Sequence, residues 1–309
     1  MVKNFIYLPL KEVGKYLYYK FRPLSFLQNQ YGDGKIIITG PTQGIGPAYC
    51  EALIRAGYTD FLLIDEDQTK LDTLETKLKA YYEDNVLKHK KHLIGEDEGH
   101  TNQLKLQMFL FDFDESYDQD RFKALEKIMI DITENTDLKI SMLVNNFAKV
   151  KKGSYESLDY KDISEMINGN INAITYMTKF VLTKMNHQEP KCAIINVGSA
   201  TASKVRANGR FNMKEYQVYQ ATQTYQLAFT NLLHSEYGDV IDFLNDLPCT
   251  FNMAKDDIDN MGLNVKPAEH VEAVLKTLGK ETTSNGTLSH TFLFYLMKKS
   301  PIPIFKFFS

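Results

Sequence analysis

Three glycines mark the first stretch of the sequence that could do chemistry. Gly40, Gly44 and Gly46 follow the apolar run 35–39 directly, and apolar residues at helical spacing continue over 48–56. Glycines let the backbone turn tightly and approach a pyrophosphate, which sits at a helix N-terminus because free N–H groups and the helix dipole favour anions there. The stretch therefore predicts a dinucleotide-phosphate site. Glycine motifs of this kind are common, so other residues must support it.

An acidic residue stands where dinucleotide sites use one. Residues 61–64 form a second predicted strand, and Asp65 ends it, roughly 20 residues beyond the glycines. A carboxylate at this point accepts hydrogen bonds from the adenosine ribose and repels a 2′-phosphate, which favours NAD(H) over NADP(H). The structural alternative is that Asp65 only begins a turn in the acidic run 65–67. Asp112, at the end of a third predicted strand over 107–113, could contact the adenine.

The remaining periodic segments predict alternating strands and helices. We expect strands over 142–144, 193–197 and 240–244, and helices over 68–83, 121–134, 159–186 and 216–237. The polar, aperiodic segment 84–105 is expected to be a solvated loop. Strands and helices alternating at this spacing predict an α/β domain, with a single Rossmann-type, doubly wound parallel sheet and helices on both faces.

The two ends of the chain differ in charge from the body. Residues 1–30 hold five basic residues and one acid, and residues 291–309 hold three basic residues and no acid, although the net charge is −3. Helical spacing of apolar and basic residues over 9–23 leaves four alternatives open. The segment could be an interfacial helix, an uncleaved organellar targeting segment, a helix packed on a partner, or a helix on its own domain. We divide the chain into a basic amphipathic N-terminal segment (1–30), a Rossmann-type domain (31–290) and a basic aromatic C-terminal tail (291–309).

The composition argues against several classes of partner and cofactor. A hydrophobic fraction of 43% and a charged fraction of 24% are ordinary for a globular protein. The net charge does not favour a nucleic acid partner. Three isolated cysteines and seven scattered histidines indicate neither a disulfide framework nor a metal site. No apolar run approaches the ~20 residues that span a bilayer, and residues 1–30 lack the apolar core of a secretory signal peptide.

Several motifs occur in the order and spacing of a known family. They are Tyr31-Gly32, Thr39-Gly40, Gly44 to Tyr49, Leu143 to Asn146, Ile194 to Val197, Tyr219 to Tyr237 and Asn285 to His290. Over roughly residues 31–300 the chain resembles the short-chain dehydrogenase/reductase family. It resembles most the branch of 17-beta-hydroxysteroid dehydrogenases and very-long-chain 3-oxoacyl-CoA reductases. With the residue arguments above, the resemblance implies a cofactor site at Thr39, Gly40, Gly44, Ile45, Gly46, Asp65, Asp112 and Asn145.

The resemblance also implies an active site of asparagine, serine, tyrosine and lysine. Asn170 matches the asparagine that holds a water in a proton relay, Ser199 the serine that orients the substrate carbonyl, and Tyr219 the general acid/base. Gln223 stands where the family has its lysine, four residues after the tyrosine. That lysine lowers the tyrosine pKa from ~10 and grips the nicotinamide ribose. Glutamine has no charge, so we expect a severe loss of turnover, larger for alcohol oxidation than for ketone reduction.

The nicotinamide end departs from the family at other positions too. Ala148 replaces a glycine and the bulky Phe147 precedes it, and both are expected to crowd the cofactor. Cys249 replaces the glycine of a Pro-Gly pair, and the following threonine is out of register. Ser199 and Tyr219 are 20 positions apart, a longer gap than the family's usual one. The insertion brings four basic residues near the mouth: Lys204, Arg206, Arg210 and Lys214. None of these stands four residues after the tyrosine, where the helix would present a lysine on the same face.

These departures favour a pseudoenzyme, which is a dehydrogenase fold that serves as a structural or accessory subunit. It is expected to hold NAD(H) through the adenosine half, or no cofactor. Its basic, aromatic ends (1–30 and 291–309) are expected to dock on protein partners or a membrane surface. A mitochondrial membrane is preferred, with the endoplasmic reticulum as the alternative.

Two other functions stay open. One is an active NAD(P)(H)-dependent reductase of a 3-oxoacyl-CoA or ketosteroid, with an altered proton relay. The other is an NAD(H)-sensing module without turnover. The resemblance also makes a homodimer plausible, because the helices over 159–186 and 216–237 usually build the family's dimer interface.

Overall fold

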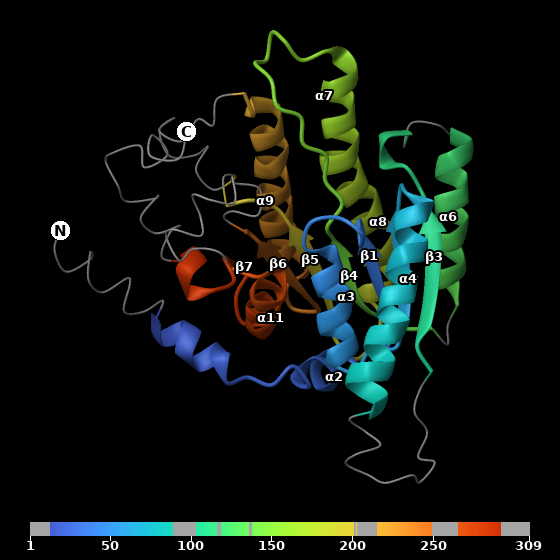
Figure 1. Ribbon diagram of the computed structural model, residues 1–309, viewed down its shortest axis with the longest axis vertical. Helices are drawn as coiled ribbons and strands as arrows, with labels where there is room; N and C mark the ends of the chain where they lie inside the picture. The colour runs from blue at the N-terminus through green and yellow to red at the C-terminus, as the bar shows by residue number, and fades with distance from the viewer. Residues whose placement is uncertain are drawn as a thin grey trace, which may run out of the picture.

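In the computed structural model, seven parallel strands form one sheet. The strands are β1 Lys35–Thr39, β2 Asp60–Asp65, β3 Lys105–Leu110, β4 Ile140–Asn145, β5 Cys192–Val197, β6 Ile241–Asp246 and β7 Thr283–Ser284. Their order is β3-β2-β1-β4-β5-β6-β7 (Figure 1). The direction of winding therefore reverses between β1 and β4, and in open α/β sheets ligands bind beyond the strand ends at such a point. The structure describes residues 13–88, 103–115, 119–135, 138–200, 202, 215–248 and 265–291.

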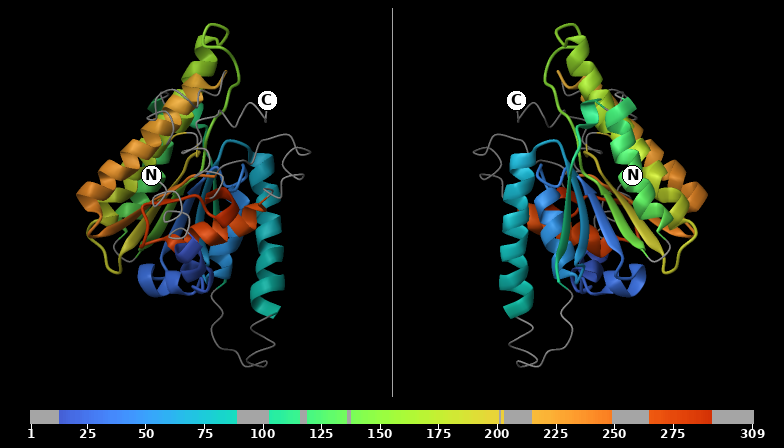
Figure 2. Two further views of the ribbon diagram at one scale, coloured as in Figure 1. Left: turned by 90° about the vertical axis from the view of Figure 1, so that its left-hand side faces the viewer. Right: turned by 90° about the vertical axis from the view of Figure 1, so that its right-hand side faces the viewer.

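Helices cover both faces of this sheet, which confirms the predicted fold class. The helices are α2 Phe26–Tyr31, α3 Gly46–Arg55, α4 Gln68–Tyr82, α6 Gln119–Glu134, α7 Tyr160–Ile167, α8 Ala173–Met185, α9 Gln217–Tyr237 and α11 Pro267–Thr277. Figure 2 shows the sheet between two layers, with α3, α4 and α11 on one face and α6, α8 and α9 on the other.

The strand sequences explain this three-layer arrangement. In β1, Ile36 and Ile38 pack in the apolar cluster beneath α3, whereas Ile37 packs in the opposite cluster beneath α8. All three side chains are 0% exposed. Side chains alternate between the faces of a strand, so a sheet covered on both faces needs a continuous apolar run. The runs in β1, β2 and β5 meet this requirement.

Some elements differ from the sequence expectation. β3 ends at Leu110, so Asp112 lies two residues beyond it. The helix expected over 159–186 contains a π-helical turn, Asn168–Asn172, between α7 and α8. A second π-helical turn over Glu83–Leu87 prolongs α4 where a loop was expected. The rest of that expected loop, 89–102, lies outside the described residues. The short α2 and β7, and also α11, were not predicted.

Residues 13–20 form a helix that lies on its own domain beside α11 (Figure 1). Lys15 Nζ lies 2.8 Å from the Glu281 carboxylate, and the Tyr19 hydroxyl donates to the same carboxylate at 3.1 Å. Arg22 donates to two carbonyl oxygens at the C-terminal end of α11, at 3.0 and 2.9 Å. Of the four alternatives for the N-terminal segment, packing on the chain's own domain is therefore observed for this part. Among the helices described, none is both long and apolar enough to cross a membrane.

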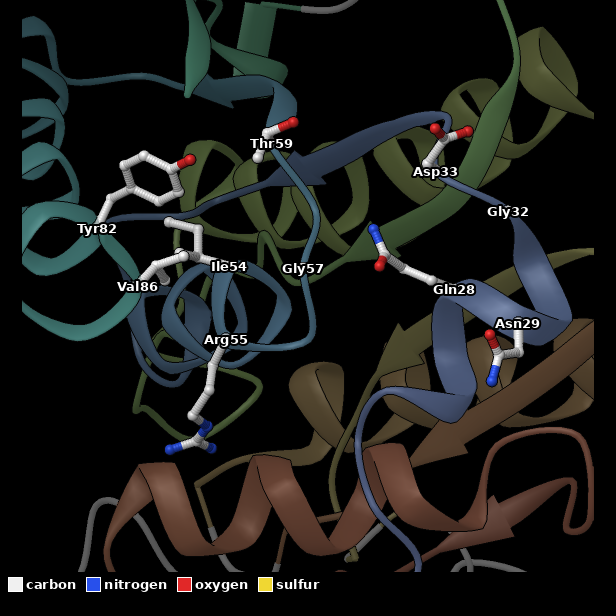
Figure 3. A pocket seen from close by; sticks show the side chains of 10 residues that line it. All are labelled: Gln28, Asn29, Gly32, Asp33, Ile54, Arg55, Gly57, Thr59, Tyr82 and Val86. Carbon is white, nitrogen blue, oxygen red and sulfur yellow. The ribbon is translucent and has the colours of Figure 1, made fainter. Parts of the chain in front are cut away.

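A cavity of about 580 Å³ lies near the N-terminal ends of β1 and β2, whereas the glycine turn follows the C-terminal end of β1. Its polar lining includes Gln28, Asn29, Asp33, Arg55, Thr59 and Tyr82 (Figure 3). The Arg55 guanidinium turns away to Glu272 of α11, at 2.8 Å. Because β1 begins near this cavity and ends at the glycine turn, the cavity is separate from the predicted cofactor site.

Candidate active site

The glycine turn between β1 and α3 has the shape of an anion cradle. Gly40 and Gly44 have φ values of +62° and +52°, a left-handed conformation that glycine adopts without strain. A Cβ on Gly46 would lie 2.5 Å from the Gly40 carbonyl oxygen, whereas a Cβ on Gly44 would meet nothing within 4 Å. Ile45 precedes α3 and is 3% exposed. The turn is therefore tightly packed at Gly46 and leaves open space at Gly44. This open space lies at the N-terminus of α3, as a phosphate site requires.

The paired asparagines at the end of β4 have different tasks. Asn146 Nδ2 donates to the Gly40 carbonyl oxygen at 2.6 Å and so fixes the glycine turn. Asn145, the predicted cofactor residue, instead donates to Asn196 Oδ1 at 2.8 Å. Thr39 accepts a hydrogen bond from the backbone N–H of Phe147 at 3.3 Å. These contacts tie the ends of β1, β4 and β5 together beneath the turn.

Asp65 is fully buried and its carboxylate already has partners. One oxygen accepts from the Thr42 N–H at 3.1 Å and from its hydroxyl at 2.8 Å. The other oxygen accepts from the Glu66 N–H at 2.8 Å. The sequence placed Asp65 correctly at the end of β2, but in this structure its contacts are to the protein's own glycine turn.

Acidic residues gather at the ends of β2 and β3. Glu66, Asp112 and Asp114 each bring a carboxylate oxygen within 4.8 Å of the others, a grouping that could hold a metal ion. The Lys149 ammonium lies against this group, 2.5 Å from Glu66 and 3.0 Å from Asp114. Burial raises the pKa of Asp114, although its ion pair with Lys149 acts in the opposite direction. A lysine thus supplies the positive charge that a metal would otherwise bring.

The residues that match the family's serine and tyrosine are brought together. Ser199, two residues after the end of β5, forms a hydrogen bond with the Tyr219 hydroxyl of α9, despite the long gap between them in the sequence. Burial raises the pKa of Tyr219 to about 12, and the hydrogen bond with Ser199 only partly offsets this. The phenol is therefore protonated at neutral pH. It can donate a proton, but it is a poor base.

Asn170 also lies close to α9. Its Oδ1 accepts from the Lys149 N–H at 2.7 Å, and its Nδ2 donates to the Lys149 carbonyl at 2.9 Å. The same Nδ2 donates to Thr222 Oγ1 at 2.9 Å, and that hydroxyl donates to the Tyr219 carbonyl at 2.8 Å. The π-helical turn that contains Asn170 thus positions it between β4 and α9. Such turns often occur at functional sites.

The side chain of Gln223 is buried in the core of the site. The side chain is 1% exposed, and among the residues described neither of its amide atoms makes a hydrogen bond. Its Oε1 lies 3.3 Å from where a Cβ on Gly198 would stand, with Gln226 Nε2 at 3.0 Å from the same point. An unpaired buried amide costs about 1–3 kcal/mol. The lysine position is therefore polar, enclosed and without charge.

The side chain of Phe147 belongs to the buried core. Its ring packs in the apolar cluster between the sheet and α8, 4.9 Å from the ring of Phe113, and it is 6% exposed. The expectation that Phe147 crowds the cofactor is therefore wrong for its ring, because the ring fills the core. The expectations for Cys249 and for the four basic residues between 204 and 214 fall outside the described residues.

Sequence reasoning missed a row of buried amides. Asn145, Asn196 and Asn245 occupy paired positions on β4, β5 and β6. Asn196 accepts from Asn145 and donates to Thr230 of α9, both at 2.8 Å. The three asparagines stand at the same register near the ends of three predicted strands, a signal that was available in the sequence.

Similarity to known proteins extends over most of the chain. A family model described as short chain dehydrogenase matches residues 94–241. The very-long-chain 3-oxoacyl-CoA reductase of Macaca fascicularis is 27% identical over 275 residues, which are 86% of this chain and 75% of that protein.

Two solved structures show the same fold. A 7beta-hydroxysteroid dehydrogenase aligns with a TM-score of 0.69 and 17% identity, over 90% of this chain and 96% of that one. A 3-ketoacyl-(acyl-carrier-protein) reductase from Brucella melitensis, complexed with NADH, aligns with a TM-score of 0.58 and 16% identity, over 79% and 90%.

Proposed function

We propose that the chain is a catalytically inactive member of the short-chain dehydrogenase/reductase superfamily with an accessory role, related to the very-long-chain 3-oxoacyl-CoA reductases. The observation that carries this proposal is Gln223, a neutral side chain buried where the family's lysine stands. The glycine turn keeps the shape of a phosphate site, so NAD(H) remains the candidate ligand.

The proton chemistry supports a loss of turnover. With a pKa of about 12, Tyr219 is deprotonated in about one molecule in 10,000 at pH 8. In the part of the chain that the structure describes, burial and the Ser199 hydrogen bond are the influences on this pKa. A general base works best when its pKa lies near the operating pH, so alcohol oxidation suffers most.

The accessory role is supported by the outer face of the N-terminal helix. Leu17, Tyr18 and Phe21 are 50%, 70% and 80% exposed, next to the exposed Lys20. Large apolar side chains beside basic ones suit the surface of an anionic membrane or an apolar patch on a partner. We therefore propose that this face docks the protein on a membrane-associated complex. The basic, acid-poor N-terminal segment favours a mitochondrial membrane over the endoplasmic reticulum.

The second candidate is a working reductase of a 3-oxoacyl-CoA or ketosteroid. The hydrogen bond between Ser199 and Tyr219 favours it, because in ketone reduction a nicotinamide cofactor would supply the hydride and the protein would need to supply only a proton donor at the carbonyl oxygen. The name of the macaque relative, a very-long-chain 3-oxoacyl-CoA reductase, suggests the substrate class.

A turnover assay separates the two candidates. Purified protein is incubated with NADH or NADPH and a long-chain 3-oxoacyl-CoA or a ketosteroid, beside its Tyr219→Phe variant and the macaque relative as positive control. We expect no turnover above background for the wild type and for the variant alike. Turnover that Tyr219→Phe abolishes would refute the proposal and establish the reductase.

A further inference from the structure

A lysine lies beside the residues at which the adenosine of a dinucleotide was predicted to bind. Lys149 follows β4, and its Nζ lies 2.5 Å from Glu66 Oε2 and 3.0 Å from Asp114 Oδ2. Glu66 directly follows the predicted ribose position, Asp65, and Asp114 follows the predicted adenine position, Asp112. The ammonium thus bridges the ends of β2 and β3 from the end of β4.

This bridge belongs to a set of contacts that reaches the glycine turn. Gln43 Nε2 donates to the second oxygen of Glu66 at 3.2 Å. Thr42 donates to Asp65 through both its N–H and its hydroxyl, at 3.1 and 2.8 Å. Both acidic side chains at the end of β2 are therefore held by the turn, and a ribose hydroxyl can reach Asp65 Oδ2 only by displacing Thr42.

Lys149 is fixed in this position and stays charged. Asn170 clamps its backbone N–H and carbonyl, as described above. The Lys149, Glu66 and Asp114 side chains are 20%, 22% and 15% exposed, so salt screens this bridge less than a surface ion pair. Burial lowers the pKa of Lys149, but the two carboxylates outweigh burial and the net shift is upward.

We propose that Lys149 closes the predicted adenosine site through its bridge to Glu66 and Asp114, and that NAD(H) binds only to the form in which this bridge has opened. Binding to a minor form weakens the observed affinity in proportion to the fraction of molecules in that form. An open fraction of about one tenth would weaken NADH binding about tenfold. The inference goes beyond the loss of turnover, because it concerns affinity and the opposite end of the cofactor.

The test is a binding titration with NADH, AMP and nicotinamide mononucleotide. The Lys149→Met variant keeps the length of the side chain and removes its charge. We expect NADH and AMP to bind this variant about tenfold more tightly than they bind the wild type. Nicotinamide mononucleotide lacks the adenosine, so its affinity is expected to stay unchanged.

Lys151→Met is the matched control. Lys151 lies two residues further along the chain and also bridges two carboxylates, Asp162 at 3.2 Å and Glu165 at 2.9 Å. These partners belong to α7, and neither is an ion-pair partner of Lys149, so this variant is expected to bind all three ligands as the wild type does.

A second variant guards against misfolding, because Lys149→Met leaves two acids without their partner. Glu66→Gln weakens the bridge and retains Lys149, and a smaller gain in NADH affinity is expected. Thermal unfolding establishes that each variant is folded. The proposal is overturned if the folded Lys149→Met variant binds NADH no more tightly than the wild type, if neither binds it, or if nicotinamide mononucleotide gains as much affinity as AMP.

Discussion

Replacing Gln223 by lysine should place a positive charge near Tyr219, at the position where the family has its lysine. Burial holds the Tyr219 pKa at about 12, and the hydrogen bond with Ser199 lowers it only in part. A cation within about 4–6 Å lowers the pKa of such a group by roughly 1–3 units. A shift of about two units raises the tyrosinate fraction at pH 8 by a factor of about 100.

The same substitution has a cost that can be bounded. Gln223 is 1% exposed, and an ammonium at its position loses most of its hydration. The penalty for a buried ion is several kcal/mol, and removal of the unpaired amide recovers about 1–3 kcal/mol. We expect the free energy of unfolding to fall by roughly 2–4 kcal/mol, which a protein of ordinary stability survives.

The assay is a titration of tyrosinate absorbance against pH. The chain has 18 tyrosines, so the signal of Tyr219 is the difference between Gln223→Lys and the double variant with Tyr219→Phe. The corresponding difference for wild type and Tyr219→Phe gives the reference. The reasoning is refuted if the folded Gln223→Lys protein shows Tyr219 titrating at the wild-type pH. If turnover appears, it should rise more for alcohol oxidation than for ketone reduction.

Three further predictions concern stability. Asn196→Ala should lower the free energy of unfolding by about 2–3 kcal/mol in urea, because its 0% exposed amide joins β4 to α9 and its partners lose their hydrogen bonds; no change would mean that the buried row is not structural. Gly286→Ala should cost about 2–4 kcal/mol, since φ is +71° and the new Cβ would lie 2.3 Å from His270 Nδ1; a variant as stable as the wild type would show that the loop relaxes freely. Burial lowers the pKa of His290 to about 4. The unfolded chain therefore binds an extra proton between about pH 6.5 and 4, and stability falls as the pH drops through that range, by about 2–3 kcal/mol. Urea midpoints at pH 7 and pH 4.5 check this, and the His290→Gln variant should lose this part of the pH dependence.

The strands were predictable wherever the sheet is covered on both faces. β1 coincides with the predicted run 35–39, because five buried residues in succession have few other structures available. β3 was placed two to three residues too late, because its burial alternates and its exposed Lys105 resembles a loop residue. β7 has only two residues and depends on β6 for its pairing, so no pattern announces it.

The candidate site was predictable in its positions but not in its contacts. Ser199 and Tyr219 meet because strand and helix order alone bring the end of β5 to α9. Sequence order does not show that Asp65 is held by Thr42, since Asp65 was assigned to the cofactor and Thr42 was assigned no role. The bridge between Lys149 and Glu66 joins residues 83 positions apart, and only the arrangement of the strand ends brings them together.

The docking of the N-terminal helix on residues near position 281 has a consequence during synthesis. Its anchor, Glu281, follows Lys15 by 266 positions, and the carbonyls that hold Arg22 follow it by 254 and 256. At about 5–20 residues per second, the ribosome needs roughly 13–50 s to make that length of chain. This helix therefore emerges long before the residues on which it packs have been made. Throughout this interval, Leu17, Tyr18 and Phe21 are available to chaperones or to a targeting receptor. Leu17, Tyr18 and Phe21, which stay exposed in the finished protein, are thus also exposed while the rest of the chain is being made.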